Sequence, residues 1–203
     1  MKKTLLTMVL AASMLSGCSM IGGQETVSYE DLKHEGAELA IRSNGDNYVP
    51  SIVKEAEVAR IAVNTAFLAS KPAYERYTEE LLATPALGNY FSAVEAVDSE
   101  EEKRAIYDSL TEEDKKVVDN YMASSVFSEV IEGLKDAALP ATKSVVTFMA
   151  MDQTDLLDGV EFSALLTEKD KFALTAEQAL YLNETVVSAY ENYQIISAFS
   201  AAE

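Results

Sequence analysis

Few residues of this chain belong to the types that perform catalysis or bind metals. His34 is the only histidine, and it stands between Lys33 and Glu35 on a predicted helix, where a solvent-exposed ring is expected. Cys18 is the only cysteine, which leaves no pair for a disulfide and no thiolate cluster for a metal. The sequence contains no glycine-rich phosphate loop, no zinc-ligand spacing and no nucleophile elbow. An enzyme is therefore the least favoured class of function, although carboxylates distant in sequence can still meet in space.

Three aspartates precede a glycine in the C-terminal half and have the composition of a cation loop. They are Asp152, Asp155 and Asp158, followed by Gly159. Calcium loops of the EF-hand type place ligands at every second residue and end on a bidentate glutamate. A spacing of three instead places the carboxylates on one side of a helical turn. We therefore predict a solvated face or a helix cap here, and no metal site.

The N-terminal segment has the layout of a secretory signal. Lys2 and Lys3 form a short positive region, and residues 5–14 form an apolar run. This run is about half as long as the roughly 20 residues that a membrane-spanning helix needs. A cleaved signal peptide is therefore favoured over a retained transmembrane anchor.

The apolar run ends in the four residues Leu15-Ser16-Gly17-Cys18. This motif resembles the lipobox of bacterial lipoproteins. The resemblance implies cleavage between Gly17 and Cys18, which removes residues 1–17 as the signal peptide. It also implies that a diacylglyceryl thioether forms on the Cys18 sulfur and that the new amino group is acylated. These lipids are the only prosthetic groups expected, and several acyl chains together give stable anchoring.

The residue after the cysteine bears on the destination of the lipoprotein. In the Gram-negative lipoproteins that this signal resembles, aspartate at this position retains the protein in the inner membrane, whereas serine allows transfer to the outer membrane. Ser19 therefore implies an outer-membrane lipoprotein. We expect its domain to face the periplasm.

The charge balance excludes some partners. The formal net charge is −18, and removal of Lys2 and Lys3 with the signal peptide would take it to −20. Such acidity argues against nucleic acid and against flat adsorption on anionic lipid headgroups. It leaves open a basic protein partner, divalent cations or adaptation to salt.

The rest of the chain predicts a short flexible tether and one domain. Residues 18–27 are expected to form the lipidated cysteine and its tether, and residues 28–203 a single compact all-α domain. Helix starts are predicted from capping residues and prolines. They are Ser28, Pro50, Ser70-Lys71-Pro72, Thr84-Pro85, Ser99, Thr111 and Thr175.

Hydrophobic periodicity predicts which helices are buried. Residues 50–68 carry two apolar stripes, Ile52-Ala56-Ala59-Val63-Ala66 and Val58-Ile61-Ala62-Thr65-Leu68, and should form the central helix. The helix from Thr111 should run to about Ala138, with a break or kink at Pro140. Residues 144–151 should be buried, and the region 152–159 irregular. The last helix carries a seam of apolar residues at steps of three and four, namely Ala179, Leu182, Val186, Ala189, Tyr193 and Ile196.

Aromatic and methionine side chains form the remaining candidate surface. Tyr190 and Tyr193, together with Phe148 and Met149, could line a groove for a partner helix, a peptide or an acyl chain. The same residues at helical spacing are typical of a core, and tyrosine must fill large volumes in a chain without tryptophan. Core packing is the favoured interpretation.

Three hypotheses of function follow. The first is a non-enzymatic outer-membrane lipoprotein that acts as a periplasmic adaptor and binds another envelope protein. The second is a helical carrier for an apolar ligand such as an acyl chain, which requires a closed apolar cavity. The third is an acidic immunity-type inhibitor of a cationic protein, which predicts salt-dependent binding.

Overall fold

The computed structural model describes residues 19–21, 24–43 and 48–200. Its elements are β1 (Ser19–Ile21), β2 (Gln24–Thr26), α1 (Tyr29–Arg42), α2 (Lys54–Ala83), α3 (Pro85–Glu95), α4 (Glu100–Ser109), α5 (Glu112–Met122), α6 (Ser125–Met149), α7 (Gln153–Leu157), α8 (Phe162–Leu182), a π-helical turn η2 (Asn183–Val187) and α9 (Ser188–Ser200). Apart from the two short strands, the described residues form helices around one core. The predicted all-α single domain is confirmed.

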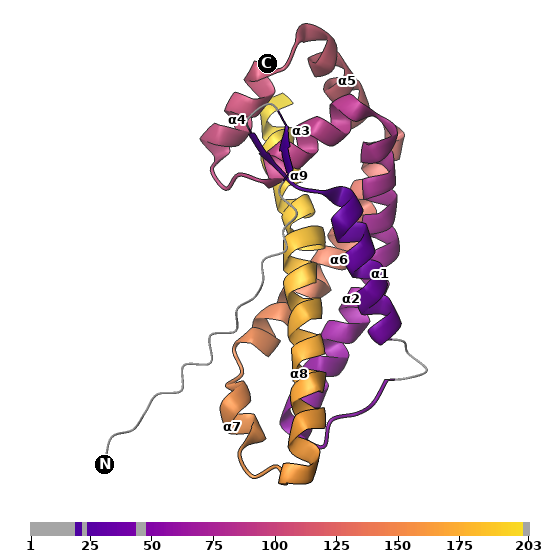
Figure 1. The fold of residues 1–203 in the computed structure, drawn as a ribbon. Helices are drawn as coiled ribbons and strands as arrows, with labels where there is room; N and C mark the ends of the chain where they lie inside the picture. Colours follow the sequence, from indigo (N-terminus) through magenta and orange to yellow (C-terminus); the bar gives the residue numbers. More distant parts are fainter. Residues whose placement is uncertain (1–18, 22–23, 44–47, 201–203) are drawn as a thin grey trace, which may run out of the picture.

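The molecule is an elongated bundle (Figure 1). The long helices α2, α6 and α8 run along its length. One end, here called the head, consists of the hairpin β1–β2 with α3, α4 and α5. The opposite end, here called the distal end, consists of residues 48–61 and 142–168. No helix among the described residues is long and apolar enough to cross a membrane.

Small residues let α2 and α6 approach closely. A Cβ built on Gly133 would lie 3.4 Å from the Cβ of Ala73, and both helices bury further alanines such as Ala66 and Ala141. Arg76 and Glu129 form an ion pair of 2.9 Å across the two helices. Residue 73 therefore lies beside residue 133, which makes the two helices antiparallel.

Four helices begin at a side-chain cap. The hydroxyls of Ser28, Ser99 and Thr111 accept hydrogen bonds from the amide three residues later, at 3.3, 3.2 and 3.1 Å. These three predicted starts are confirmed, as is the start at Pro85. Ser124 was not predicted as a cap, yet it accepts from the Phe127 amide at 3.1 Å. It splits the long helix that was predicted from Thr111 into α5 and α6.

The predicted helix start at Pro72 and the predicted helix end before Pro140 are wrong. Pro72 lies inside α2 and Pro140 inside α6. Each proline removes one backbone donor, but both rings are exposed, so water can reach the carbonyl that is left unpaired. The packing of α2 on α6 outweighs this local cost. The predicted start at Pro50 is also wrong, since α2 begins at Lys54.

The predicted start of the last helix at Thr175 is also wrong, because α8 runs through this residue without a break. Thr175 lies within α8, and its hydroxyl donates to the Lys171 carbonyl at 3.0 Å. The helix continues through η2 into α9. The predicted seam is buried, with Tyr193 partly exposed. The region 152–159 contains the short helix α7.

Two segments predicted to be buried expose one side. In residues 144–151, Phe148 is fully buried, but Val146 and Met149 are 62% and 53% exposed. In α2 the first apolar stripe is buried from Ala56 onward, whereas Val58 and Ile61 of the second stripe are exposed. The apolar periodicity marked these positions as helical, but it did not distinguish a core face from an uncovered one.

A hairpin replaces the predicted flexible tether. Strands β1 and β2 pair antiparallel, with Ser19 opposite Thr26 and Ile21 opposite Gln24. The Val27 amide then donates to the Ser92 carbonyl of α3 at 3.1 Å, and the Ser92 hydroxyl donates to the Val27 carbonyl. The chain that follows Cys18 is therefore joined to the head. The predicted signal peptide, residues 1–17, and the predicted lipidation site Cys18 lie outside the described residues.

Candidate functional site

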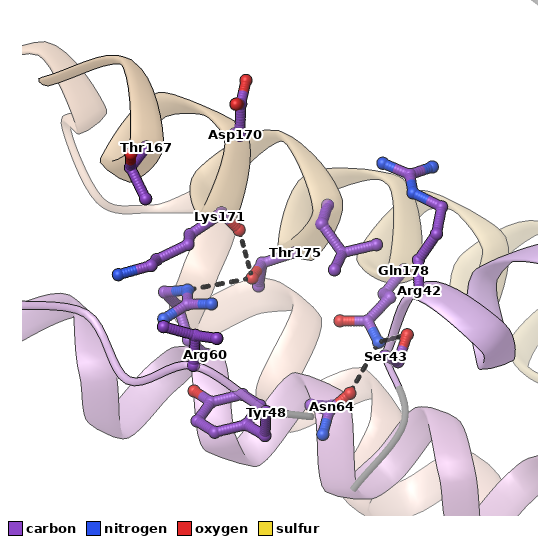
Figure 2. Close-up of a pocket in the computed structure, with 12 residues that line it drawn as sticks. Arg42, Ser43, Tyr48, Arg60, Asn64, Thr167, Asp170, Lys171, Thr175 and Gln178 are labelled. Carbon is purple, nitrogen blue, oxygen red and sulfur yellow. Dashed lines mark hydrogen bonds between the residues drawn. The ribbon is translucent and has the colours of Figure 1, made fainter. Parts of the chain in front are cut away.

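A pocket of about 360 Å³ lies between the end of α1, the segment before α2, and α8 (Figure 2). It is open to solvent on one side, and most of its lining residues carry polar groups, although most of the surface that they expose to the pocket is carbon. The lining residues are Arg42, Ser43, Tyr48, Val49, Arg60, Asn64, Thr167, Asp170, Lys171, Leu174, Thr175 and Gln178.

The Gln178 carboxamide links three helices beside this pocket. Its amide nitrogen donates to the Ser43 hydroxyl at 2.7 Å and to the Asn64 side-chain oxygen at 2.8 Å. Gln178 and Ser43 are both buried, and Ser43 in turn donates to the Leu39 carbonyl. Buried polar groups that are bonded in this way hold one orientation. The carboxamide is therefore a fixed feature of the pocket.

Arg60 forms a second fixed group. Its side chain is 4% exposed, and it pairs with Glu57 at 2.8 Å and donates to the Thr175 hydroxyl at 3.3 Å. The Tyr48 ring lies 5.4 Å from the guanidinium carbon, and the Tyr48 hydroxyl donates to Glu57 at 2.9 Å. The buried charge is thus neutralised by its own carboxylate and covered by an aromatic ring.

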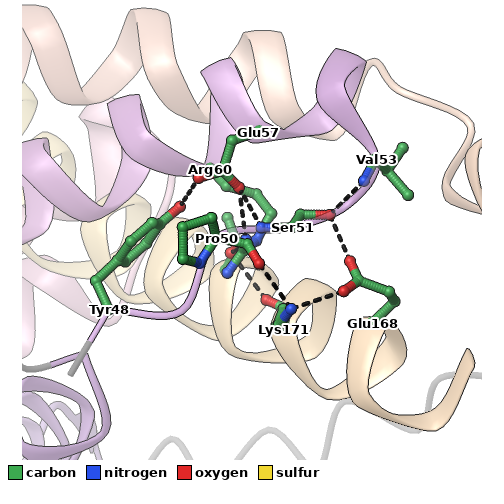
Figure 3. Close-up of polar contacts among 9 residues, drawn as sticks. Tyr48, Pro50, Ser51, Val53, Glu57, Arg60, Glu168 and Lys171 are labelled. Atoms are coloured by element: carbon green, nitrogen blue, oxygen red, sulfur yellow. Dashed lines mark hydrogen bonds and ion pairs between the residues drawn. The ribbon is translucent and has the colours of Figure 1, made fainter. Parts of the chain in front are cut away.

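Glu168 fastens the segment before α2 to α8 (Figure 3). Its carboxylate accepts from the Ser51 hydroxyl and from Lys171 at 2.7 Å, and Lys171 also donates to the Pro50 carbonyl at 2.7 Å. Burial acts to raise the pKa of Glu168, but the hydrogen bonds from Lys171 and Ser51 outweigh it and hold the pKa below its ordinary value. The pair of Glu168 and Lys171 thus holds the segment before α2 against α8 at the edge of the pocket.

These groups are suited to binding. Nucleophilic catalysis needs a hydroxyl bonded to a base such as histidine. The Ser43 and Thr175 hydroxyls instead donate to backbone carbonyls. The arrangement around the pocket therefore provides directional hydrogen-bonding groups and no activated nucleophile.

A different buried carboxylate lies in the head. Glu95 ends α3 and accepts from the Tyr77 hydroxyl at 2.7 Å. Burial raises the pKa of Glu95 to about 7, although the hydroxyls of Tyr77 and Tyr29 and the charge of Lys103 oppose the rise. Phenol hydroxyls stabilise a carboxylate less than an ammonium does, so this group titrates near neutral pH.

The predicted single-residue sites lie apart from the pocket. His34 is exposed and lies 3.7 Å from Glu38, as expected for a surface residue. Asp152 accepts from the Asp155 amide at 3.2 Å in the first turn of α7, which fits the predicted cap. Within the described ranges, no group of three His, Cys, Asp or Glu residues is arranged to hold a metal ion.

The four residues of the predicted aromatic and methionine surface lie in two places. Tyr190 and Tyr193 are partly buried on α9, with ring centroids 6.4 Å apart, and the Tyr193 ring lies 5.5 Å from Phe127. Phe148 packs on Phe172 at 6.4 Å near the end of α6, while Met149 beside it is exposed. The structure does not bring the two pairs together.

Sequence reasoning missed the pocket residues. They are Arg42, Ser43, Tyr48 and Val49, together with residues in the ranges 60–64 and 167–178. The one available signal was Arg60, a charged residue next to Ala59, which lies on a predicted core stripe. A charge at such a position indicates a buried partner, but it does not identify that partner.

Comparisons with known proteins leave the site without a relative: no protein-family model, curated protein or solved structure matches this chain.

Proposed function

We propose that this protein is a non-enzymatic lipoprotein of the outer membrane, anchored through lipid on Cys18. Its head lies at the bilayer, and its distal end extends into the periplasm and contacts another envelope protein. The protein acts as an adaptor that holds this partner at a fixed distance from the membrane.

The position of the hairpin supports the anchoring geometry. Ser19 follows Cys18 directly and belongs to β1, and the hairpin is joined to α3 through Val27 and Ser92. A lipid on Cys18 would therefore hold the head close to the bilayer. The 30 residues of α2 span about 45 Å at 1.5 Å per residue, which carries the distal end well beyond the headgroups.

The observation that carries the proposal is the cluster of exposed apolar side chains at the distal end. Phe162 is 86% exposed, Val58 74% and Leu166 69%. The full set at this end is Val49, Ile52, Val58, Ile61, Val146, Met149, Phe162 and Leu166. Elsewhere in the described residues, large apolar side chains are exposed at Ile41 (76%), Leu139 (64%), Leu82 (45%), Val126 (37%) and Leu180 (37%). Eight of these thirteen exposed side chains thus lie at the distal end, and exposed apolar surface on an acidic protein is typical of a protein contact.

The geometry favours the adaptor over the carrier. The carrier hypothesis requires an apolar cavity between the last helix and residues 144–151, but Phe148 is fully buried there against Phe172. The pocket between α1, α2 and α8 lies elsewhere and is open to solvent, whereas a carrier requires a closed cavity. An immunity-type role remains the second candidate because the net charge of −18 suits a cationic partner.

Photo-crosslinking in the native cells tests this function. A photoreactive amino acid replaces Leu166 at the distal end or, as the matched control, Leu82 next to the head. We expect one adduct of defined mass from position 166, none from position 82, and loss of the adduct when Cys18→Ser releases the protein from the membrane. Equal labelling from both positions, or an adduct that does not depend on Cys18, would contradict the proposal.

A further inference from the structure

We propose that the pocket between α1, α2 and α8 binds an uncharged, polyhydroxylated ligand, a mono- or disaccharide that is either free or at the end of a glycan. This inference does not rest on the adaptor function, although the pocket borders the distal end and Val49 belongs to both surfaces.

The lining first indicates a ligand with both polar and apolar parts. Ten of the twelve lining residues carry a polar or charged group, although most of the surface that the lining exposes to the pocket is carbon. An acyl chain placed here would desolvate the polar groups without replacing their hydrogen bonds, which is costly. The ligand therefore carries polar groups of its own.

The charges next exclude a ligand with a large net charge. Three cationic side chains line the pocket, but each already has a carboxylate partner: Arg42 with Glu177, Arg60 with Glu57, and Lys171 with Glu168. The exposed carboxylate of Asp170 adds a further negative charge. An anion would compete with these existing pairs and meet the Asp170 carboxylate, and a cation would find the other nearby carboxylates already paired. A neutral ligand meets neither obstacle.

The side-chain amides of Gln178 and Asn64 then indicate which polar groups the ligand carries. Both hydrogens of the Gln178 amide are used by Ser43 and Asn64, and its carbonyl oxygen has no donor among the described residues. Figure 2 shows this oxygen directed away from Ser43. The side-chain nitrogen of Asn64 likewise has no acceptor within the described part of the chain. An acceptor and a donor are thus held side by side.

Neighbouring hydroxyl groups match this pair, because each hydroxyl both donates and accepts. The volume of about 360 Å³ is at the small end of ligand sites and suits one or two sugar rings. Tyr48 adds an aromatic ring at the wall, held by Arg60 and Glu57. Size, neutrality and paired amides together indicate a saccharide.

Nuclear magnetic resonance titration of the full-length, detergent-solubilised lipoprotein tests the inference. The probes are glucose, N-acetylglucosamine and cellobiose, with sodium phosphate and sodium glutamate as charged comparisons. We expect saturable shifts from at least one sugar, strongest at the lining residues Asn64, Leu174 and Gln178, and no saturable shifts from the charged probes. Absence of saturation by every sugar, or tighter binding of phosphate or glutamate, would overturn it.

Two variants and a control assign the binding to the pocket. Asn64→Ala should weaken sugar binding by about tenfold, the effect of about one lost hydrogen bond. Asp170→Ala changes an exposed residue at the rim of the pocket, so it tests sugar binding at the same wall without changing a buried group. Asn120→Ala on α5 is the matched control and should leave binding unchanged. Sugar binding that neither pocket variant weakens would overturn the assignment.

Co-sedimentation with purified peptidoglycan distinguishes the two sources of sugar. Sedimentation that cellobiose or N-acetylglucosamine reverses assigns the end of a glycan. Binding of the soluble sugars without sedimentation assigns a free sugar. Either result supports the saccharide site.

Discussion

The two ends of the bundle bury carboxylates in opposite ways. In the head, Glu95 faces the Tyr77 hydroxyl, and burial raises its pKa to about 7. Next to the distal end, Glu168 faces the Lys171 ammonium, and its pKa lies below the ordinary value. The head is an aromatic core that disfavours charge, whereas the distal end keeps its ion pairs and exposes apolar side chains. We therefore expect the head to contribute strongly to stability, while the proposed function places recognition at the distal end.

The largest expected difference in the free energy of unfolding comes from replacing a phenylalanine with alanine at each end. Phe91 in α3 is buried and contacts the rings of Tyr77, Tyr90 and Phe127, with centroids 5.1 to 6.2 Å apart. Phe91→Ala should lower the free energy of unfolding by about 4 kcal/mol. Phe162→Ala at the distal end should change it by no more than about 0.5 kcal/mol. Urea denaturation measures both, and similar losses would contradict the division of roles.

Removal of the Lys171 ammonium should lower the free energy of unfolding almost as much as Phe91→Ala does. Lys171→Met leaves the Glu168 carboxylate buried without its ionic partner, and we expect a loss of about 3 kcal/mol at neutral pH. Because Glu168 has a lowered pKa in the fold, the wild-type pair contributes its stability above the unfolded pKa and loses it as pH falls through the folded pKa. The gap between variant and wild type should therefore narrow at acidic pH. A gap that stays constant would show that Lys171 acts through packing alone.

The head carboxylate should give the opposite dependence on pH. Protonation stabilises the folded state more than the unfolded state, so the stability from Glu95 is present below pH 4.5 and is lost as pH rises through about 7. Glu95→Gln should remove this dependence and be more stable than wild type at pH 8 by at most about 3 kcal/mol. Urea denaturation of both proteins at pH 5 and pH 8 measures the difference. A constant difference between the two pH values would contradict the raised pKa.

Helix capping gives the smallest effect. The head begins α4 and α5 at side-chain caps, and Ser124 caps α6, whereas Glu161 before α8 has no side-chain cap bond. Ser124→Ala should cost about 1 kcal/mol, and Glu161→Ser should stabilise by about 0.5 kcal/mol. Thermal unfolding should therefore shift in opposite directions for the two variants.

Local signals predicted much of the fold. Three capping residues, the proline at the start of α3 and the apolar seam through α9 are where the sequence placed them, because each depends on neighbours within a turn or two. The predictions failed at Pro72 and Pro140, where packing between distant helices overrides a local preference. Periodicity also did not show that Val58 and Val146 lack a covering element.

These local signals could not predict the candidate site. Ser43, Asn64 and Gln178 come from three helices, and only the tertiary fold brings their side chains within hydrogen-bonding distance. The lipobox is different, since the whole motif is contiguous in sequence. The sequence therefore predicted an anchor, while the pocket required the structure.

The orientation of the bundle on the membrane tests the central claim most directly. Cys18 carries the lipid, so Leu166→Cys or Leu82→Cys each introduces a single free thiol for a fluorophore. With the lipidated protein in vesicles, we predict little energy transfer from the bilayer surface to position 166 and strong transfer to position 82, as expected for a separation of about 45 Å along α2. Strong transfer to position 166, or its quenching by lipid-bound quenchers, would contradict the account, because it would place the distal end against the bilayer.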